Sequence, residues 1–149
     1  MPQPAGGGRR RGRELAMKLL YQCELGGQPL DAAVATHEEY AAAAARSQTF
    51  ALQLARGVQE HRAEIDTTLK ASLTGWADDR LAAIDATLLR MAIFELLYSE
   101  DIPARVAIDE AIELSREYST EGSSSFVNGV LDAVATRHAP HKLSIIKKD

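Results

Sequence analysis

Cysteine is almost absent from this chain of 149 residues, which carries Cys23 alone. A single thiol can form no internal disulfide and supplies no cysteine-based zinc site, so disulfide scaffolds and zinc ribbons are excluded. Such sparing use of cysteine is typical of a reducing compartment. No apolar run approaches the ~20 residues that cross a bilayer, and the glycine-rich start lacks the apolar centre of a secretory signal. We therefore expect a cytoplasmic protein without a membrane segment.

The motifs of common catalytic sites are missing as well. The sequence contains no Walker-type phosphate loop, no G-x-S-x-G nucleophile elbow and no H-E-x-x-H metal pair. His138 and His141 are three residues apart, but Pro140 between them prevents a shared helix face, so we do not expect them to bind a metal. The sequence thus predicts neither an enzyme nor a bound cofactor.

Charge is unevenly distributed along the chain. The whole chain has a net charge of −4, whereas residues 1–21 sum to +4 and the remainder therefore to −8. The basic side chains of this first segment are Arg9, Arg10, Arg11, Arg13 and Lys18. A cationic end on an acidic body indicates an anionic partner, with RNA the leading candidate. The alternative is a solvated, flexible basic N-terminus over residues 1–10, which Pro4 and the following glycines also favour.

Apolar residues recur at helical spacing almost throughout, which predicts an all-α fold with about seven helices. A first helix is expected over about residues 11–25, with Leu15, Ala16, Leu19, Leu20 and Cys23 on its buried face. On this pattern Cys23 is interpreted as a core residue. Asp31 is the expected N-cap of a second, alanine-rich helix over residues 32–46. A further helical stretch starts at Ser47, bends near His61 and continues to Leu73.

Residues 74–78 break the helical pattern and are predicted to divide the chain into two packed bundles. The N-terminal bundle covers about residues 11–74 and the C-terminal bundle about residues 78–137, together forming one domain over 11–137. A long helix near residues 79–99 is apolar on more than one side, which predicts a central, buried position. Helices at 106–118 and 124–136 follow, separated by a serine- and glycine-rich loop. Residues 138–149 are predicted to be a C-terminal tail.

The first predicted helix carries a basic stripe that includes an aromatic ring. At about 100° per residue, Arg11, Glu14, Lys18 and Tyr21 share a face opposite Leu15 and Leu19. This pattern is typical of single-stranded RNA binding, in which cations follow the phosphates and a ring stacks on an unpaired base. The alternative is that Tyr21 is a surface tyrosine packed against the second helix.

Phe126 is a second candidate for stacking on a base. It is expected in the first turn of the last helix, off the face formed by Val127, Val130, Leu131 and Val134. The first amides of a helix and the hydroxyls of Ser123–Ser125 favour a phosphate, so a nucleotide is expected to be held there. The alternative is an apolar staple at the helix start.

Several strings occur in a distinctive order. Residues 110–114 read E-A-I-E-L and residues 126–132 read F-V-N-G-V-L-D. Residues 88–92 and 101–103 precede them, and the chain opens with Arg9–Glu14. In this order the strings resemble the NusB family of bacterial transcription antitermination factors. The resemblance spans nearly the whole chain, is strongest over residues 80–134 and is weakest over residues 27–50.

The resemblance implies an all-α protein that acts by binding. NusB proteins pair with NusE, a small-subunit ribosomal protein, and together they hold the boxA element of nascent transcripts. With other Nus factors on RNA polymerase, they suppress termination during ribosomal RNA synthesis. Carried over by position, the RNA-contacting residues are Arg9, Arg10, Arg11, Arg13, Lys18, Tyr21 and Phe126. Asp85 falls where the family usually has an acid, in a region implicated in the RNA and NusE surfaces. Ser124, from the serine hydroxyls before Phe126, is a further candidate for the RNA or NusE surface.

Two other functions stay open at this point. One is the NusB-like domain of a bacterial RNA cytosine methyltransferase, although the chain has no residues left for the large catalytic domain of such an enzyme. The other is a helical protein-binding adaptor that acts through oligomerisation, without specific RNA binding. The sequence also leaves open whether the free protein is a monomer or a homodimer.

Overall fold

The computed structural model describes residues 7–73 and 81–147, and every regular element within them is a helix. The all-α prediction is therefore confirmed. Nine helices occur in these residues rather than about seven. The chain divides into two compact units, Met1–Glu60 and His61–Asp149.

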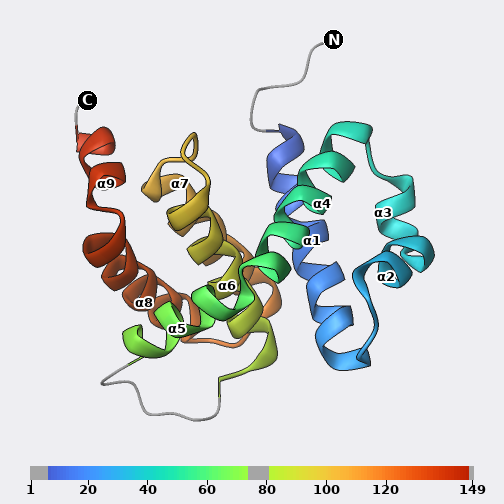
Figure 1. The fold of residues 1–149 in the computed structure, drawn as a ribbon, viewed down its shortest axis with the longest axis horizontal. Coiled ribbons are helices and arrows are strands. Elements are labelled where there is room, and N and C mark those ends of the chain that lie inside the picture. The colour runs from blue at the N-terminus through green and yellow to red at the C-terminus, as the bar shows by residue number, and fades with distance from the viewer. Residues whose placement is uncertain (1–6, 74–80, 148–149) are drawn as a thin grey trace. The chain divides into compact units, whose positions relative to one another are not determined.

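The first unit contains four helices, of which α1 and α4 are the long pair. They are α1 (Gly7–Gly26), α2 (Leu30–Thr36), α3 (Glu38–Ala42) and α4 (Ala45–Glu60). Helices α1 and α4 lie side by side (Figure 1). The buried apolar side chains of these helices are Leu15, Ala16, Met17, Leu19, Leu20, Leu30, Ala33, Ala51, Leu54, Ala55 and Val58. The face predicted for the first helix is thus confirmed, except that Cys23 at its end is only half-buried.

Gly12 allows α1 to approach α4 closely. A Cβ atom at this position would stand 2.8 Å from Cδ2 of Phe50 and 3.1 Å from the carbonyl oxygen of Ser47. The second of these atoms is backbone, which moves only if the helix moves. Gly12 therefore sets the distance between the two longest helices of the first unit.

The second predicted helix, residues 32–46 with Asp31 as N-cap, is wrong. The N-cap of α2 is Pro29, and the helix ends before His37, whose backbone is extended. The His37 imidazole accepts a hydrogen bond from the Tyr40 amide at 3.2 Å and so caps a separate helix, α3. The alanine run at residues 41–45 spans the end of α3 and the start of α4. Side-chain capping here outweighs the helix propensity of alanine.

The second unit is built around α6. Its helices are α5 (Arg62–Ser72), α6 (Ala83–Tyr98), α7 (Ala104–Tyr118), α8 (Ser123–His138) and α9 (Pro140–Lys147). Helix α6 contacts α5, α7 and α8 (Figure 1), and side chains on several of its faces are buried, which confirms the central position predicted for it. The largest buried apolar side chains of the unit are Ile65, Leu69, Leu88, Leu89, Met91, Ile93, Leu96, Ile102, Ile108, Leu114 and Leu131.

The division between the units lies earlier than the predicted break at residues 74–78. Helix α5 follows a bend at His61, as expected, but it packs in the second unit rather than in a bundle over 11–74. Asp66 on α5 accepts hydrogen bonds from Arg62 and from Arg90 of α6, each at 2.8 Å. Burial raises the pKa of Asp66, but these two arginines more than offset it and leave the pKa lowered. Residues 74–80, which include the predicted break and the expected helix start at residue 79, lie outside the described residues.

Both predicted chain ends need correction. Helix α1 begins at Gly7, so residues 7–10 are helical rather than part of a flexible N-terminus, and residues 1–6 lie outside the described residues. The predicted C-terminal tail is helical over Pro140–Lys147, where it forms α9.

Lys142 anchors α9. Its side chain is 1% exposed, and its Nζ donates to the carbonyl oxygens of Glu95, Leu96 and Ser99 at 2.7, 3.3 and 2.6 Å. These carbonyls belong to the C-terminal end of α6, which attracts a cation. Burial nevertheless lowers the pKa of Lys142, against the opposing effect of nearby carboxylates.

Gly12→Ala is expected to destabilise the protein by about 1–3 kcal/mol, because the added methyl group overpacks the contact between α1 and α4. The effect opposes helix propensity, which favours alanine over glycine by about 1 kcal/mol inside a helix. Gly26→Ala is the matched control, since a Cβ atom there meets nothing within 4 Å. Urea unfolding of both variants measures the difference. A Gly12→Ala protein as stable as the parent would contradict the close approach.

Candidate nucleic-acid interface

The arginines at the start of the chain lie in the first turns of α1. Arg9 and Arg10 are exposed, and the Arg9 guanidinium lies 5.6 Å from the centre of the Phe50 ring on α4. The N-terminal end of a helix carries a partial positive charge of its own. Cations at this end add to that charge, so the start of α1 attracts anions.

The basic stripe of α1 has the orientation expected from the sequence. Arg11, Glu14, Lys18 and Tyr21 are all half-buried, whereas Leu15 on the opposite face is fully buried. The stripe is therefore the outer face of the helix, and Tyr21 lies on it among the charged side chains.

Carboxylates already pair with two cations of the stripe. Arg11 binds Glu14 one turn along α1, and Lys18 binds Glu39 of α3 at 2.7 Å. The hydrogen bond from Lys18, together with its charge, lowers the pKa of Glu39. Glu39 is thus held ionised beside the stripe, and a phosphate that binds there exchanges with a carboxylate.

Arg13 differs from the other arginines because it is buried. Its side chain is 5% exposed, and its guanidinium lies 5.1 Å from the centre of the Phe50 ring. A cation over an aromatic face is attracted by the ring quadrupole. The sequence carried a signal for this placement, since Arg13 lies three residues before Ala16 and seven before Leu20, on the side of α1 that enters the core.

Cys23 is hydrogen-bonded to Gln59 and half-buried. Burial raises the pKa of its thiol, with the Gln59 hydrogen bond acting in the opposite direction. A raised pKa disfavours the thiolate, which is the nucleophilic form of cysteine.

In the second unit, Phe126 lies one turn into α8 and is half-buried. Val127, Val130, Leu131 and Val134 are fully buried, so Phe126 is off the core face as predicted. Gly122 precedes the helix with a φ of 94°, a left-handed conformation that favours glycine. Ser124, a candidate for the RNA or NusE surface, is half-buried in the same first turn.

Asp85 is buried, which its position at the start of α6 did not reveal. Its side chain is 7% exposed, and its two carboxylate oxygens accept hydrogen bonds from the hydroxyls of Ser119 and Ser123 at 2.7 and 3.1 Å. Sequence reasoning placed both serines in a loop or a candidate phosphate site and missed this cluster. An Asp–Ser contact 34 residues apart leaves no local signal.

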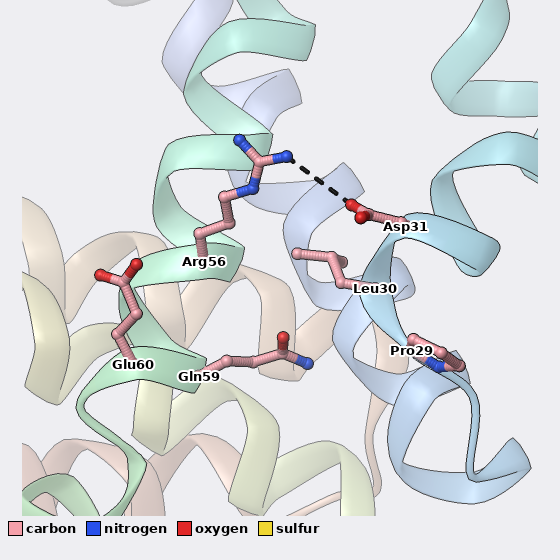
Figure 2. A pocket seen from close by; sticks show the side chains of 6 residues that line it. All are labelled: Pro29, Leu30, Asp31, Arg56, Gln59 and Glu60. Atoms are coloured by element: carbon pink, nitrogen blue, oxygen red, sulfur yellow. Dashed lines mark ion pairs between the residues drawn. The ribbon is translucent and has the colours of Figure 1, made fainter.

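The first unit also has an open pocket of about 400 Å³ between the start of α2 and the end of α4. Figure 2 shows Arg56 on α4 directed toward Asp31 on α2, with Gln59 and Glu60 on the following turn of α4. The Arg56–Asp31 ion pair measures 3.6 Å. Because two carboxylates line the pocket against one guanidinium, it does not favour a phosphate.

Within residues 7–73 and 81–147, none of the helices combines the length and the apolar character that a membrane span needs. No group of three or more His, Cys, Asp or Glu side chains in the same residues is arranged to hold a metal ion.

Comparison with known sequences gives one consistent family. The sequence pattern described as "NusB family" matches residues 10–136. The transcription antitermination protein NusB of Geobacter sulfurreducens is 46% identical over 133 residues, which is 87% of this chain and 95% of that protein.

Solved structures agree with this match. T. maritima NusB has a TM-score of 0.80 and 35% identity, with coverage of 97% of this chain and 99% of that one. A chain from the structure of the antitermination factors NusB and NusE in complex with dsRNA has a TM-score of 0.76 and 25% identity, covering 87% of this chain and 97% of that chain. The protein is therefore a member of the NusB family of transcription antitermination factors.

Proposed function

We propose that this protein binds boxA-type single-stranded RNA together with NusE, as part of a Nus complex on RNA polymerase during ribosomal RNA transcription. The observation that carries the proposal is the set of exposed arginines at the start of α1 in a chain that is otherwise acidic. The protein acts by binding, through surfaces on both units, and catalyses no reaction.

The cations of α1 provide the general attraction for RNA. Arg9 and Arg10 contact phosphates from their exposed positions, while Arg11 and Lys18 exchange Glu14 and Glu39 for phosphate oxygens. Arg13, which the sequence placed in this set, is instead buried between α1 and α4, where it packs on the Phe50 ring and stabilises α1. Four cations then reach the RNA.

The two rings provide contacts to bases. Tyr21 lies on the outer face of α1 and Phe126 in the first turn of α8, and each is half-buried. A half-buried ring is partly accessible to solvent and partly held by the protein, and aromatic rings of this kind stack on unpaired bases. Ser124 beside Phe126 donates a hydrogen bond to the RNA or to NusE.

NusE is the proposed protein partner. The related solved complex contains NusB, NusE and dsRNA. The net charge of −8 outside residues 1–21 suits a basic ribosomal protein, because complementary charge accelerates encounter. Other Nus factors and RNA polymerase are then reached through the complex rather than by direct contact.

The direct test measures RNA binding by the purified protein, alone and with NusE, using boxA-like, scrambled and double-stranded RNA. We expect the boxA-like single strand to bind most tightly and NusE to increase its affinity. Equal affinity for all RNAs, with or without NusE, would contradict the proposal. A protein that ignores RNA but self-associates in gel filtration would instead be a helical adaptor.

The salt dependence of binding tests the contribution of α1. If four cations meet phosphates, the logarithm of the affinity for single-stranded RNA should fall with the logarithm of salt concentration at a slope of about −3. Replacing both Arg9 and Arg10 by Gln should reduce the magnitude of the slope by about 1.4. Arg116→Gln is the matched control, since this exposed arginine of α7 pairs with Glu113 outside the proposed interface. A slope near zero for the parent would rule out the electrostatic contribution.

Stacking by the two rings is tested by truncation. Tyr21→Ala and Phe126→Ala should each reduce RNA affinity by about 1–3 kcal/mol if each ring stacks on a base. Tyr98→Ala serves as the control, because this exposed tyrosine of α6 stacks on His61 instead. Fluorescence anisotropy with labelled RNA gives the affinities. Unchanged affinity in a variant that melts at lower temperature would show that the ring only packs against the protein.

A further inference from the structure

We infer that Asp85 is a positioning residue that holds the turn between α7 and α8 and thereby orients Phe126, rather than a residue that contacts RNA or NusE itself. This inference deepens the proposed function and rests on it, since it assigns the carboxylate a part in presenting one of the two rings. The family resemblance had placed Asp85 on the RNA or NusE surface.

The burial and bonding of Asp85 oppose a direct contact. Its side chain is 7% exposed, and one serine hydroxyl donates to each of its carboxylate oxygens. A carboxylate only accepts hydrogen bonds, so two hydroxyl donors suit its ionised form. A direct contact with RNA would have to break these bonds and would bring a negative charge toward phosphates.

The two serines stand at opposite ends of the same turn. Ser119 is the C-cap of α7, where its amide donates to the carbonyl of Ser115 at 2.9 Å, and Ser123 is the first residue of α8. Their hydroxyl oxygens are 2.9 Å apart, and Gly122 between them adopts a left-handed conformation. The carboxylate of Asp85 therefore ties both ends of the turn to the start of α6.

The hydrogen bond between Asp85 and Ser123 also affects Phe126, because both Ser123 and Phe126 lie in the first turn of α8. Phe126 follows Ser123 by three residues, so the two side chains lie on the same side of the helix. The next residue, Val127, is fully buried and fixes the helix from its core side. With Ser123 held by Asp85 and Val127 held by the core, the backbone of the first turn of α8, from which the Phe126 ring projects, is fixed.

The charge of Asp85 also suits this place. Ser123, the first residue of α8, donates a hydrogen bond to the Asp85 carboxylate. The carboxylate therefore lies near the positive end of the α8 dipole. A phosphate at the same end would meet a like charge. The contribution of this turn to RNA binding is therefore the ring of Phe126 rather than an anion site.

The test is a double-mutant cycle in RNA affinity, measured by fluorescence anisotropy with a boxA-like single strand. Asp85→Ala should weaken binding about threefold to tenfold and should cause little further loss in the Phe126→Ala background. Ser119→Ala removes one of the two ties and should weaken binding less than Asp85→Ala. Glu113→Ala is the matched control, because it removes one negative charge from the exposed surface of α7 and leaves the turn intact.

Amide hydrogen exchange gives a second measurement that does not depend on RNA. Residues 119–126 should exchange faster in Asp85→Ala and Ser119→Ala than in the parent or in Glu113→Ala, because the turn has lost a tie. If Asp85→Ala does not fold, Ser119→Ala carries both measurements.

The outcomes separate the inference from the proposed function. If the parent binds no RNA, the proposed function fails and the inference fails with it. If the parent binds and Phe126→Ala weakens binding, the inference alone is overturned by either of two results. One is unchanged affinity in Asp85→Ala and Ser119→Ala, and the other is losses from Asp85→Ala and Phe126→Ala that multiply in the double variant, as expected of two independent RNA contacts.

Discussion

The close packing of α1 on α4 is the constraint on which the proposed interface depends, because α1 supplies both core and contact surface. Gly12 allows the approach, since any side chain there would meet Phe50 and the backbone of Ser47. At this distance Phe50 lies beneath the guanidinium groups of Arg9 and Arg13. The contact that forms the core of the first unit therefore also orders the arginines at the start of α1.

The outer face of α1 carries cations that attract phosphates and carboxylates that partly neutralise them. Arg11 and Lys18 have carboxylate partners in the free protein, and ion pairs at a protein surface contribute little to stability. Exchanging such a carboxylate for a phosphate thus costs little. The same carboxylates reduce the net positive charge of this face and so weaken nonspecific attraction for any polyanion. In the proposed interface, the rings therefore account for a larger share of recognition.

The sequence predicted those parts of the fold that follow from periodic burial. The inner face of α1, the central position of α6 and the position of Phe126 off the core face of α8 all follow from which residues recur each turn. The sequence did not predict features that depend on single polar contacts. The break at His37 rests on one side-chain cap, and the helix α9 is anchored by a lysine that appears solvent-exposed in a polar tail but binds carbonyl oxygens of α6. Partners separated by 34 or more residues, as for Asp85 and for Lys142, leave no periodic pattern.

The two units contribute physically different terms to the proposed recognition of RNA. The cations belong to the first unit, and their effect on affinity is screened by salt. The turn that carries Phe126 belongs to the second unit, where Asp85 already lies near the positive end of α8, so the contribution there comes from a ring and is less sensitive to salt. Cations alone bind any polyanion, and one ring alone gives a weak contact with any unpaired base. Under the proposed function, recognition of RNA combines a salt-sensitive contribution from the cations of α1 with a less salt-sensitive contribution from Phe126. A rigid turn at the start of α8 would reduce the entropy that is lost when this ring binds a base.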